Sequence, residues 1–149
     1  MKFYAGIGSR QTPSFILQIM TDIAKQLDKQ DYILRSGNAD GADSAFADGT
    51  DNKEIFIATD CTPAAMELSS KYHPNWNACN HYVRKLHGRN SMILLGYDLK
   101  TPVDFVICWT PDGRDTGGTG QAIRIAADYN IDVYNLYHPD HLVLVSNLY

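Results

Sequence analysis

The stretch 103–130 reads VDFVICWTPDGRDTGGTGQAIRIAADYN and decides the fold. It begins with an apolar run of β-branched and aromatic residues, Val103 to Trp109, which is typical of a short strand buried on both faces. A turn with four glycines follows, and from Ala122 to Ala127 small and apolar residues recur at helical spacing. Because glycines let backbone N–H groups approach a ligand and a helix start attracts anions, this order of elements predicts a phosphate-binding loop. The alternative is a flexible turn between two core elements.

Length and composition limit the possible classes of protein. A chain of 149 residues is long enough for one domain, 1–149, and too short for two. The net charge of −4 argues against a nucleic-acid-binding surface over much of the protein. No apolar run is long enough to cross a membrane, and the chain starts on a predicted strand rather than on a signal peptide. Three cysteines, Cys61, Cys79 and Cys108, lack the spacing of a disulfide framework, so we expect reduced thiols and a cytoplasmic protein.

Outward from this stretch, short apolar runs alternate with helical patterns along the chain. The first helix is predicted to have Thr12 as its N-cap and Pro13 at its first position. A short helix of small residues follows the second strand, with Asp40 as a candidate N-cap. The predicted strands cover residues 2–7, 32–35, 53–58, 103–109 and 131–137, with 142–145 as a sixth, short edge strand.

The segment 59–97 has a different pattern. Thr62 and Pro63 indicate the start of a short helix, which a break at 72–75 ends. Apolar residues then recur at helical spacing from Trp76 to Leu86, and 91–96 adds one more apolar helical turn.

The alternation of strands and helices predicts the fold class. It favours a single α/β, Rossmann-like domain of three layers, with a mainly parallel sheet of five or six strands. In such sheets ligands bind beyond the carboxyl ends of the strands, where the strand order reverses. Three turns rich in glycine and small polar residues are predicted to follow strands at that edge: 6–10, 36–43 and 110–121.

Several side chains in these turns have the chemistry of a phosphate or ribose site. Ser9 and Arg10 follow the first strand, where a hydroxyl and a guanidinium would hold a phosphate; an exposed turn arginine is the alternative. Asp40 and Asp43 would accept hydrogen bonds from ribose hydroxyls or act as a base, although Asp40 serves a helix cap equally well. In the glycine loop Thr116, Thr119 and Gln121 can donate to phosphate, whereas Asp112 and Asp115 would repel an anion unless they face ribose or a metal.

Metal and stacking sites are less well supported. The chain has five histidines, but no set of four residues has the spacing of a zinc site, so we predict no metal. Trp76, Tyr82 and Trp109 would stack on a base or belong to the core. Cys108 lies inside a predicted buried strand and is interpreted as packing.

The turn motifs resemble those of a known family. GIGSR after the first strand, LRSGNADGADSAFADG around the second turn and CWTPDGRDTGGTGQAIRIA after the fourth strand are similar to the SLOG superfamily of Rossmann-like nucleotide-binding proteins. Together with KLHGRNSMILLG, they look most like its small DprA-like members, which are often found in phage genomes. The resemblance implies a nucleotide-type ligand bound by Gly8, Ser9, Arg10, Ser36, Gly37, Asp43, and Gly117, Gly118, Thr119, Gly120 and Gln121. Phosphoribohydrolases of the superfamily have a catalytic glutamate where this chain has Arg124, and no proline precedes Gly117.

Three functional hypotheses follow. The first is a homo-oligomeric pocket that binds a nucleotide, or a cyclic or ADP-ribose-like derivative, and senses or sequesters it without a further cofactor. The second is a hydrolase that cleaves a glycosidic or phosphate bond of such a ligand with Asp43 as the base. The third is single-stranded DNA binding, which the acidic charge balance disfavours. The predicted ligand-binding residues are Gly8, Ser9, Arg10, Ser36, Gly37, Asp40, Asp43, Thr116, Gly117, Gly118, Thr119, Gly120 and Gln121.

Overall fold

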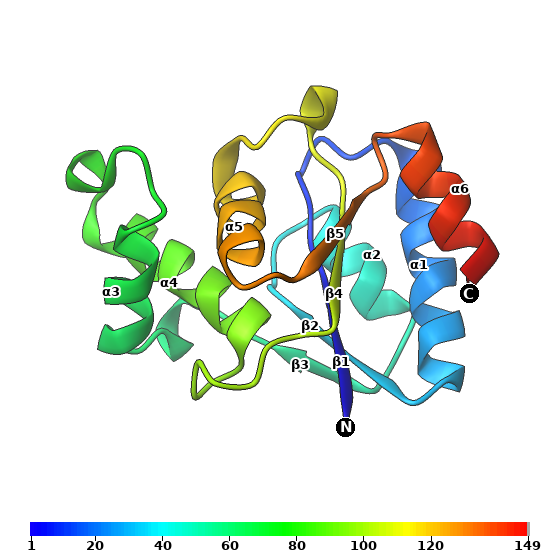
Figure 1. Ribbon diagram of the computed structural model, residues 1–149, viewed down its shortest axis with the longest axis horizontal. Helices are drawn as coiled ribbons and strands as arrows, with labels where there is room; N and C mark the ends of the chain where they lie inside the picture. Colours follow the sequence, from blue (N-terminus) through cyan, green and yellow to red (C-terminus); the bar gives the residue numbers. More distant parts are fainter. Residues whose placement is uncertain (149) are drawn as a thin grey trace.

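Five parallel strands form one sheet in the computed structural model, which describes residues 1–148 (Figure 1). The sheet has the order β3-β2-β1-β4-β5, with β1 in the centre. Tyr4 of β1 lies opposite Leu34 on one side and Phe105 on the other. The strands are β1 (Lys2–Gly6), β2 (Tyr32–Ser36), β3 (Lys53–Ile55), β4 (Phe105–Cys108) and β5 (Asp132–Asn135).

Helices cover both faces of the sheet, so the predicted three-layer, Rossmann-like α/β fold is confirmed. Figure 1 shows α1, α2 and α6 on one side and α3, α4 and α5 on the other. The helices are α1 (Ser14–Lys29), α2 (Ala42–Asp48), α3 (Pro63–Ser70), α4 (His81–Leu95), α5 (Gly117–Asp128) and α6 (Pro139–Leu148), and 3₁₀ turns lie at η1 (Ala58–Asp60), η2 (Trp76–Ala78) and η3 (Pro111–Gly113). No helix within residues 1–148 combines the length and the apolar character that crossing a lipid bilayer requires.

The two faces of the sheet carry two separate hydrophobic clusters. One contains Met20 of α1, Phe46 of α2 and Ile107 of β4, and the other contains Met92 of α4 and Ile125 of α5. All five side chains are fully buried. Since apolar burial is the main favourable term in folding, these clusters hold the helices and therefore the turns at the carboxyl edge in place.

The chain reverses its direction across the sheet after β3. From β1 it moves outward through β2 to β3, and the segment that holds α3 and α4 then returns it to β4 on the other side of β1. The carboxyl ends of β1 and β4 therefore form the switch point at which α/β sheets bind ligands. Segment 59–97, whose role the sequence pattern did not indicate, is this crossover connection.

One predicted strand is wrong. Residues 142–145 belong to α6, which begins at Pro139. Leu142 and Val145 lie three residues apart and both pack against the cluster around α1, so the helical spacing of the pair buries them together. A four-residue apolar run has no periodicity that separates a strand from a helix, which explains the error.

Two predicted helix caps are also wrong. The first helix starts at Ser14 with Pro13 as its N-cap, and the Thr12 hydroxyl instead donates to the Ser9 carbonyl at 2.6 Å. The second helix has Gly41 at its N-cap, and Asp40 is exposed. Thr62 does cap α3, because its hydroxyl accepts the Ala65 N–H at 3.1 Å. Residues 91–96 do not form a separate turn but continue α4 to Leu95.

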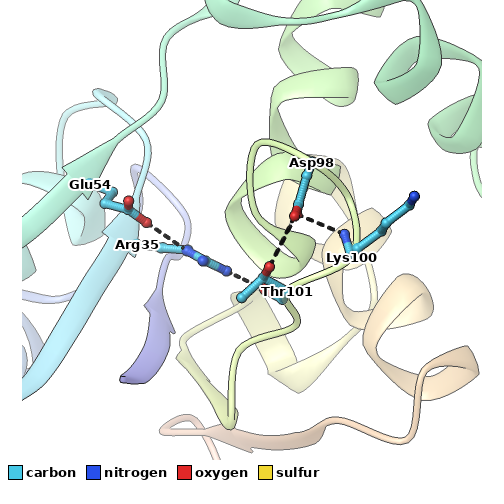
Figure 2. A network of polar contacts seen from close by, with 5 residues as sticks. All are labelled: Arg35, Glu54, Asp98, Lys100 and Thr101. Carbon is cyan, nitrogen blue, oxygen red and sulfur yellow. Dashed lines mark hydrogen bonds and ion pairs between the residues drawn. The ribbon is translucent and has the colours of Figure 1, made fainter.

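A buried arginine links β2 to the loop before β4. Arg35 is 3% exposed, and its Nε lies 2.8 Å from Glu54 Oε1 while its Nη1 donates to the Thr101 carbonyl at 2.5 Å (Figure 2). The guanidinium also stacks 3.9 Å from the ring centre of Phe3. Asp98 accepts from the Lys100 N–H and the Thr101 hydroxyl, which fixes the loop that presents Thr101 (Figure 2).

We expect Arg35→Ala to lower the free energy of unfolding by about 2 kcal/mol, because it leaves the Thr101 carbonyl without its donor and removes the packing on Phe3. Glu54→Gln should cost less than about 1 kcal/mol, since the Glu54 side chain is half exposed and such ion pairs are weak. Urea unfolding followed by circular dichroism measures both values. Equal losses in the two variants would mean that the ion pair, rather than the carbonyl contact and the packing, carries the contribution.

Candidate functional site

A cavity of about 460 Å³ lies at the carboxyl edge of the sheet, at the switch point. Its wall is formed by the turns after β1, β2 and β4, and by one face of α4. The three predicted turns therefore meet around one space. The predicted ligand-binding residues in this wall are Gly8, Ser9, Arg10, Asp43, Thr116, Gly117, Gly118 and Thr119.

Five predicted ligand-binding residues lie outside the wall. Ser36 is buried, and its hydroxyl donates to the Gly6 carbonyl at 2.5 Å, which ties β2 to β1. A Cβ at Gly37 would lie 2.7 Å from Asp43 Oδ2, and a Cβ at Gly120 would lie 2.2 Å from the Asp115 carbonyl carbon, so close packing requires both glycines. Gln121 is fully buried and bonds to α3 and α4, as described below. Asp40 is exposed.

The glycine loop presents the start of α5 to the cavity. Gly117 has φ +67°, a left-handed conformation that other residues adopt only with strain. The first backbone hydrogen bond of this helix runs from the Gly120 N–H to the Thr116 carbonyl, and the Thr116 side chain does not cap the helix. Within residues 1–148 the N–H groups of Gly117, Gly118 and Thr119 thus have no hydrogen-bond acceptor. Free donors at the N-terminus of a helix of this length favour an anion.

Helix α4 holds the glycine loop from the opposite side of the cavity. The side-chain amide of Asn90 donates to the Gly118 carbonyl at 3.4 Å. A Cβ at Gly118 would lie 3.2 Å from the Asn90 nitrogen, so a larger side chain there would displace this contact or enter the cavity. The loop is therefore positioned by a residue of the KLHGRNSMILLG segment to which the sequence analysis assigned no role.

Arg89 is the main wall residue that sequence reasoning missed. It is 7% exposed, and its Nη1 donates to Asn38 Oδ1 at 3.2 Å and to the Phe56 carbonyl at 3.0 Å. Its Nε is buried and has no hydrogen-bond partner in the described part of the chain. Burial lowers the pKa of the guanidinium, and nearby Asp43 partly offsets this effect. The result is a buried and incompletely paired positive charge beside the cavity.

Asp43 faces the same cavity from α2. Its side chain is buried, and burial raises its pKa to about 6 although Arg89, the Ala39 N–H, the Ser36 hydroxyl and Arg10 all act to lower it. The Ala39 N–H donates to Asp43 Oδ2 at 3.2 Å. A carboxyl group with a pKa near neutrality, in a cavity, has the property that a general base needs.

Other candidates from the sequence do not line the cavity. Trp76, Tyr82 and Trp109 all lie outside the wall, and Trp109 packs beside the cluster around α1. Asp112 and Asp115 are exposed and also lie outside the wall, so their charges do not enter the cavity.

Arg124 and Cys108 have structural roles. Arg124 donates to the Tyr72 carbonyl at 2.9 Å and to the Asp115 carbonyl at 3.0 Å, which anchors the glycine loop. Cys108 is fully buried, and burial raises its pKa to about 12.

A second group of reactive side chains lies at the border of the cavity. His73, Cys79 and His87 offer one ligand atom each, and these atoms lie within 4.8 Å of one another. His87 is also part of the cavity wall. Their separations of six and eight residues match no common zinc motif, which is why the sequence did not bring them together.

Neither the protein-family models nor the curated proteins nor the solved structures contain a match to this chain.

Proposed function

We propose that the cavity binds a nucleotide or a nucleotide-derived ligand, cyclic or ADP-ribose-like, and that the protein senses or sequesters it. The observation that carries this proposal is the convergence of Arg10, Arg89 and the free N–H groups of α5 around one cavity. These are the groups that proteins use to hold phosphate. They create a locally positive site in a chain whose net charge is −4.

The dimensions of the cavity support a small ligand. Ligand pockets usually measure about 300–1,000 Å³ and lie at the switch points of α/β sheets. The cavity of about 460 Å³ falls within this range. Val83, Leu86 and Ile93 add an apolar surface from α4, against which a base or ribose would pack.

The experiment that tests the proposal is native mass spectrometry of the purified protein, followed by denaturation and identification of any released small molecule. A protein that carries no ligand is then titrated by calorimetry with a panel of mononucleotides, cyclic dinucleotides and ADP-ribose. An intact ligand bound at one equivalent per subunit supports binding or sequestration. Absence of binding across the panel, with inorganic phosphate and pyrophosphate included, would refute a phosphate-binding cavity.

Arg10→Ala is expected to weaken the affinity for the bound nucleotide by about 10- to 100-fold, because it removes a charge-assisted hydrogen bond from the cavity wall. The thermal midpoint should hardly change, since the Arg10 side chain is exposed. Arg114→Ala is the matched control, because Arg114 is an exposed arginine of the glycine loop that lies outside the wall. Equal losses of affinity in the two variants would indicate a general charge effect rather than a contact.

A second function, hydrolysis of such a ligand, is favoured by one observation: the raised pKa of buried Asp43 in the cavity wall. In this alternative Asp43 takes a proton from the attacking water, and Arg89 with the α5 N–H groups stabilises the charge that develops on the leaving group. Product formation that disappears in Asp43→Asn while binding remains would support hydrolysis. Prolonged incubation with an unchanged, stoichiometrically bound ligand would exclude it for that ligand.

A further inference from the structure

We propose that His73, Cys79 and His87 form a site for a single Zn²⁺ ion at the border of the cavity, with one coordination position left open. This inference does not depend on nucleotide binding. His73 follows α3, Cys79 directly follows η2, and His87 lies in α4, so the turn of the chain between the two helices brings them together.

The spacing of the ligand atoms fits a tetrahedral ion. Zinc bonds of about 2.3 Å to sulfur and about 2.0–2.1 Å to nitrogen place the sulfur and nitrogen about 3.5 Å apart at the tetrahedral angle. Cys79 Sγ lies 3.6 Å from His73 Nε2 and 4.0 Å from His73 Nδ1. The His73 and His87 rings are 4.5 Å apart between centroids, and the three ligand atoms lie within 4.8 Å of one another. Binding therefore needs an approach of about 1 Å by His87.

The hydrogen bonds of His87 leave its outer nitrogen ready to bind a metal. The side-chain nitrogen of Gln121 donates to the Ser69 carbonyl at 3.1 Å, and a carbonyl can only accept. The amide oxygen of Gln121 therefore faces His87 Nδ1, which must carry the proton. Nε2 then keeps its lone pair.

The hydrogen bond from His87 Nδ1 to the Gln121 amide oxygen is of the kind that orients metal-binding histidines. Ligating histidines usually donate their second nitrogen to an oxygen that fixes the ring and its tautomer. Gln121 is fully buried, although glutamine is usually exposed. The glutamine that the sequence assigned to phosphate thus supports His87 instead.

His73 is the ligand that must rearrange. The Asn75 N–H donates to His73 Nδ1 at 3.0 Å, so in the metal-free protein the proton lies on Nε2. A metal on Nδ1 competes with this bond directly, and a metal on Nε2 requires the proton to move to Nδ1. In both cases the Asn75 N–H loses its acceptor, and the bond from Cys79 Sγ to the Asn75 carbonyl at 3.6 Å is also replaced. Metal binding should therefore shift the turn at 73–75.

The ligand set indicates the class of metal. Two imidazoles and one thiolate suit Zn²⁺, a borderline-soft ion that accepts nitrogen and sulfur in tetrahedral geometry. No fourth histidine, cysteine or carboxylate joins the cluster within the part of the chain that the structure describes. Three protein ligands with an open fourth position are typical of zinc ions that bind a water or an exogenous ligand. Because His87 lines the cavity, that position is next to the proposed nucleotide site.

The test uses the full chain and the metal alone. Titration of the apoprotein with Co²⁺, a spectroscopic substitute for Zn²⁺, should show one equivalent bound, with visible bands of tetrahedral cobalt and a thiolate charge-transfer band. Cys79→Ser should remove the charge-transfer band and weaken Zn²⁺ binding, measured against a chromophoric chelator, by at least about 100-fold. Gln121→Leu, which leaves all three ligands in place, should weaken it by about 10- to 100-fold.

Two variants serve as matched controls. Cys61→Ser changes another half-buried thiol, and His81→Gln changes an exposed histidine close to the site; both should bind metal like the unmodified protein. Circular dichroism shows whether each variant is folded. Failure to bind Co²⁺ or Zn²⁺ more tightly than about 10 µM would overturn the proposal, and so would a charge-transfer band that survives in Cys79→Ser but disappears in Cys61→Ser.

Discussion

Arg89→Met is expected to weaken the binding of a phosphate-bearing nucleotide by at least about 100-fold, the largest effect of any single change in the cavity. Arg89 is the buried cation of the wall, whereas Arg10 is exposed. An ionic contact is stronger in a low dielectric than in water, so the buried guanidinium contributes more to anion binding. Calorimetric titration with the ligand identified by mass spectrometry measures the loss.

The variants must distinguish a loss of ligand binding from a loss of folding. Arg89→Met alone leaves the Asp43 carboxyl without its nearby cation, which destabilises the protein. The double variant Arg89→Met with Asp43→Asn removes both charges and should remain folded. Arg84→Met is the matched control, because Arg84 lies on the same helix, outside the cavity wall. Unchanged affinity in a folded double variant would show that Arg89 does not contact the ligand.

Asp43→Asn is expected to remove a decrease of about 2–3 kcal/mol in the free energy of unfolding that occurs in the unmodified protein as the pH rises from about 4 to about 6. The folded-state pKa of Asp43 is about 6, whereas an unfolded aspartate titrates near pH 3.9. The folded protein therefore holds this proton more tightly than the unfolded chain. The contribution of Asp43 to stability is highest below pH 4, decreases as the pH rises from about 4 to about 6, and stays constant above that range.

The measurement is the difference between the unfolding free energies of the unmodified protein and the variant, determined in urea from pH 4 to pH 8. Contributions from other groups, such as His87, cancel in this difference. The charged groups that face Asp43 are Arg89 of α4 and Arg10 of the turn after β1. Asp48→Asn, an exposed aspartate of the same helix, is the control and should parallel the unmodified protein. A difference that does not change with pH would contradict the raised pKa.

The sequence predicted the sheet well because its strands are short apolar runs followed by small-residue turns. The run around β4 is buried at every position, and this continuous pattern distinguishes a central parallel strand. It predicted α6 wrongly because a run of four apolar residues is too short to show its period. The Thr12 cap failed because the Thr12 hydroxyl donates to the Ser9 carbonyl of its own turn, and the Asp40 cap failed because Gly41, one residue later, is the N-cap of α2.

The candidate site was predicted where its residues lie in turns and missed where they lie on α4. Motif reasoning finds Ser9, Arg10 and the glycine loop because glycine and small polar residues stand out in a sequence. Arg89 lies in a helical segment, in which an arginine is normally exposed. The sequence cue for this region was Gly88, next to Arg89, because a glycine inside a helix indicates that another segment packs closely against the helix. In the structure a Cβ at Gly88 would lie 2.2 Å from Cys61 Sγ. The group of His73, Cys79 and His87 left no comparable signal, because only the turn between α3 and α4 assembles it.

The outer edge of the sheet at β3 affects how copies of the chain can meet. This strand is three residues long, and all three residues are exposed, Lys53 and Glu54 among them. A short, charged edge offers few backbone groups to the strand of another molecule. Fibril-like growth by strand addition is therefore disfavoured at this edge of the sheet.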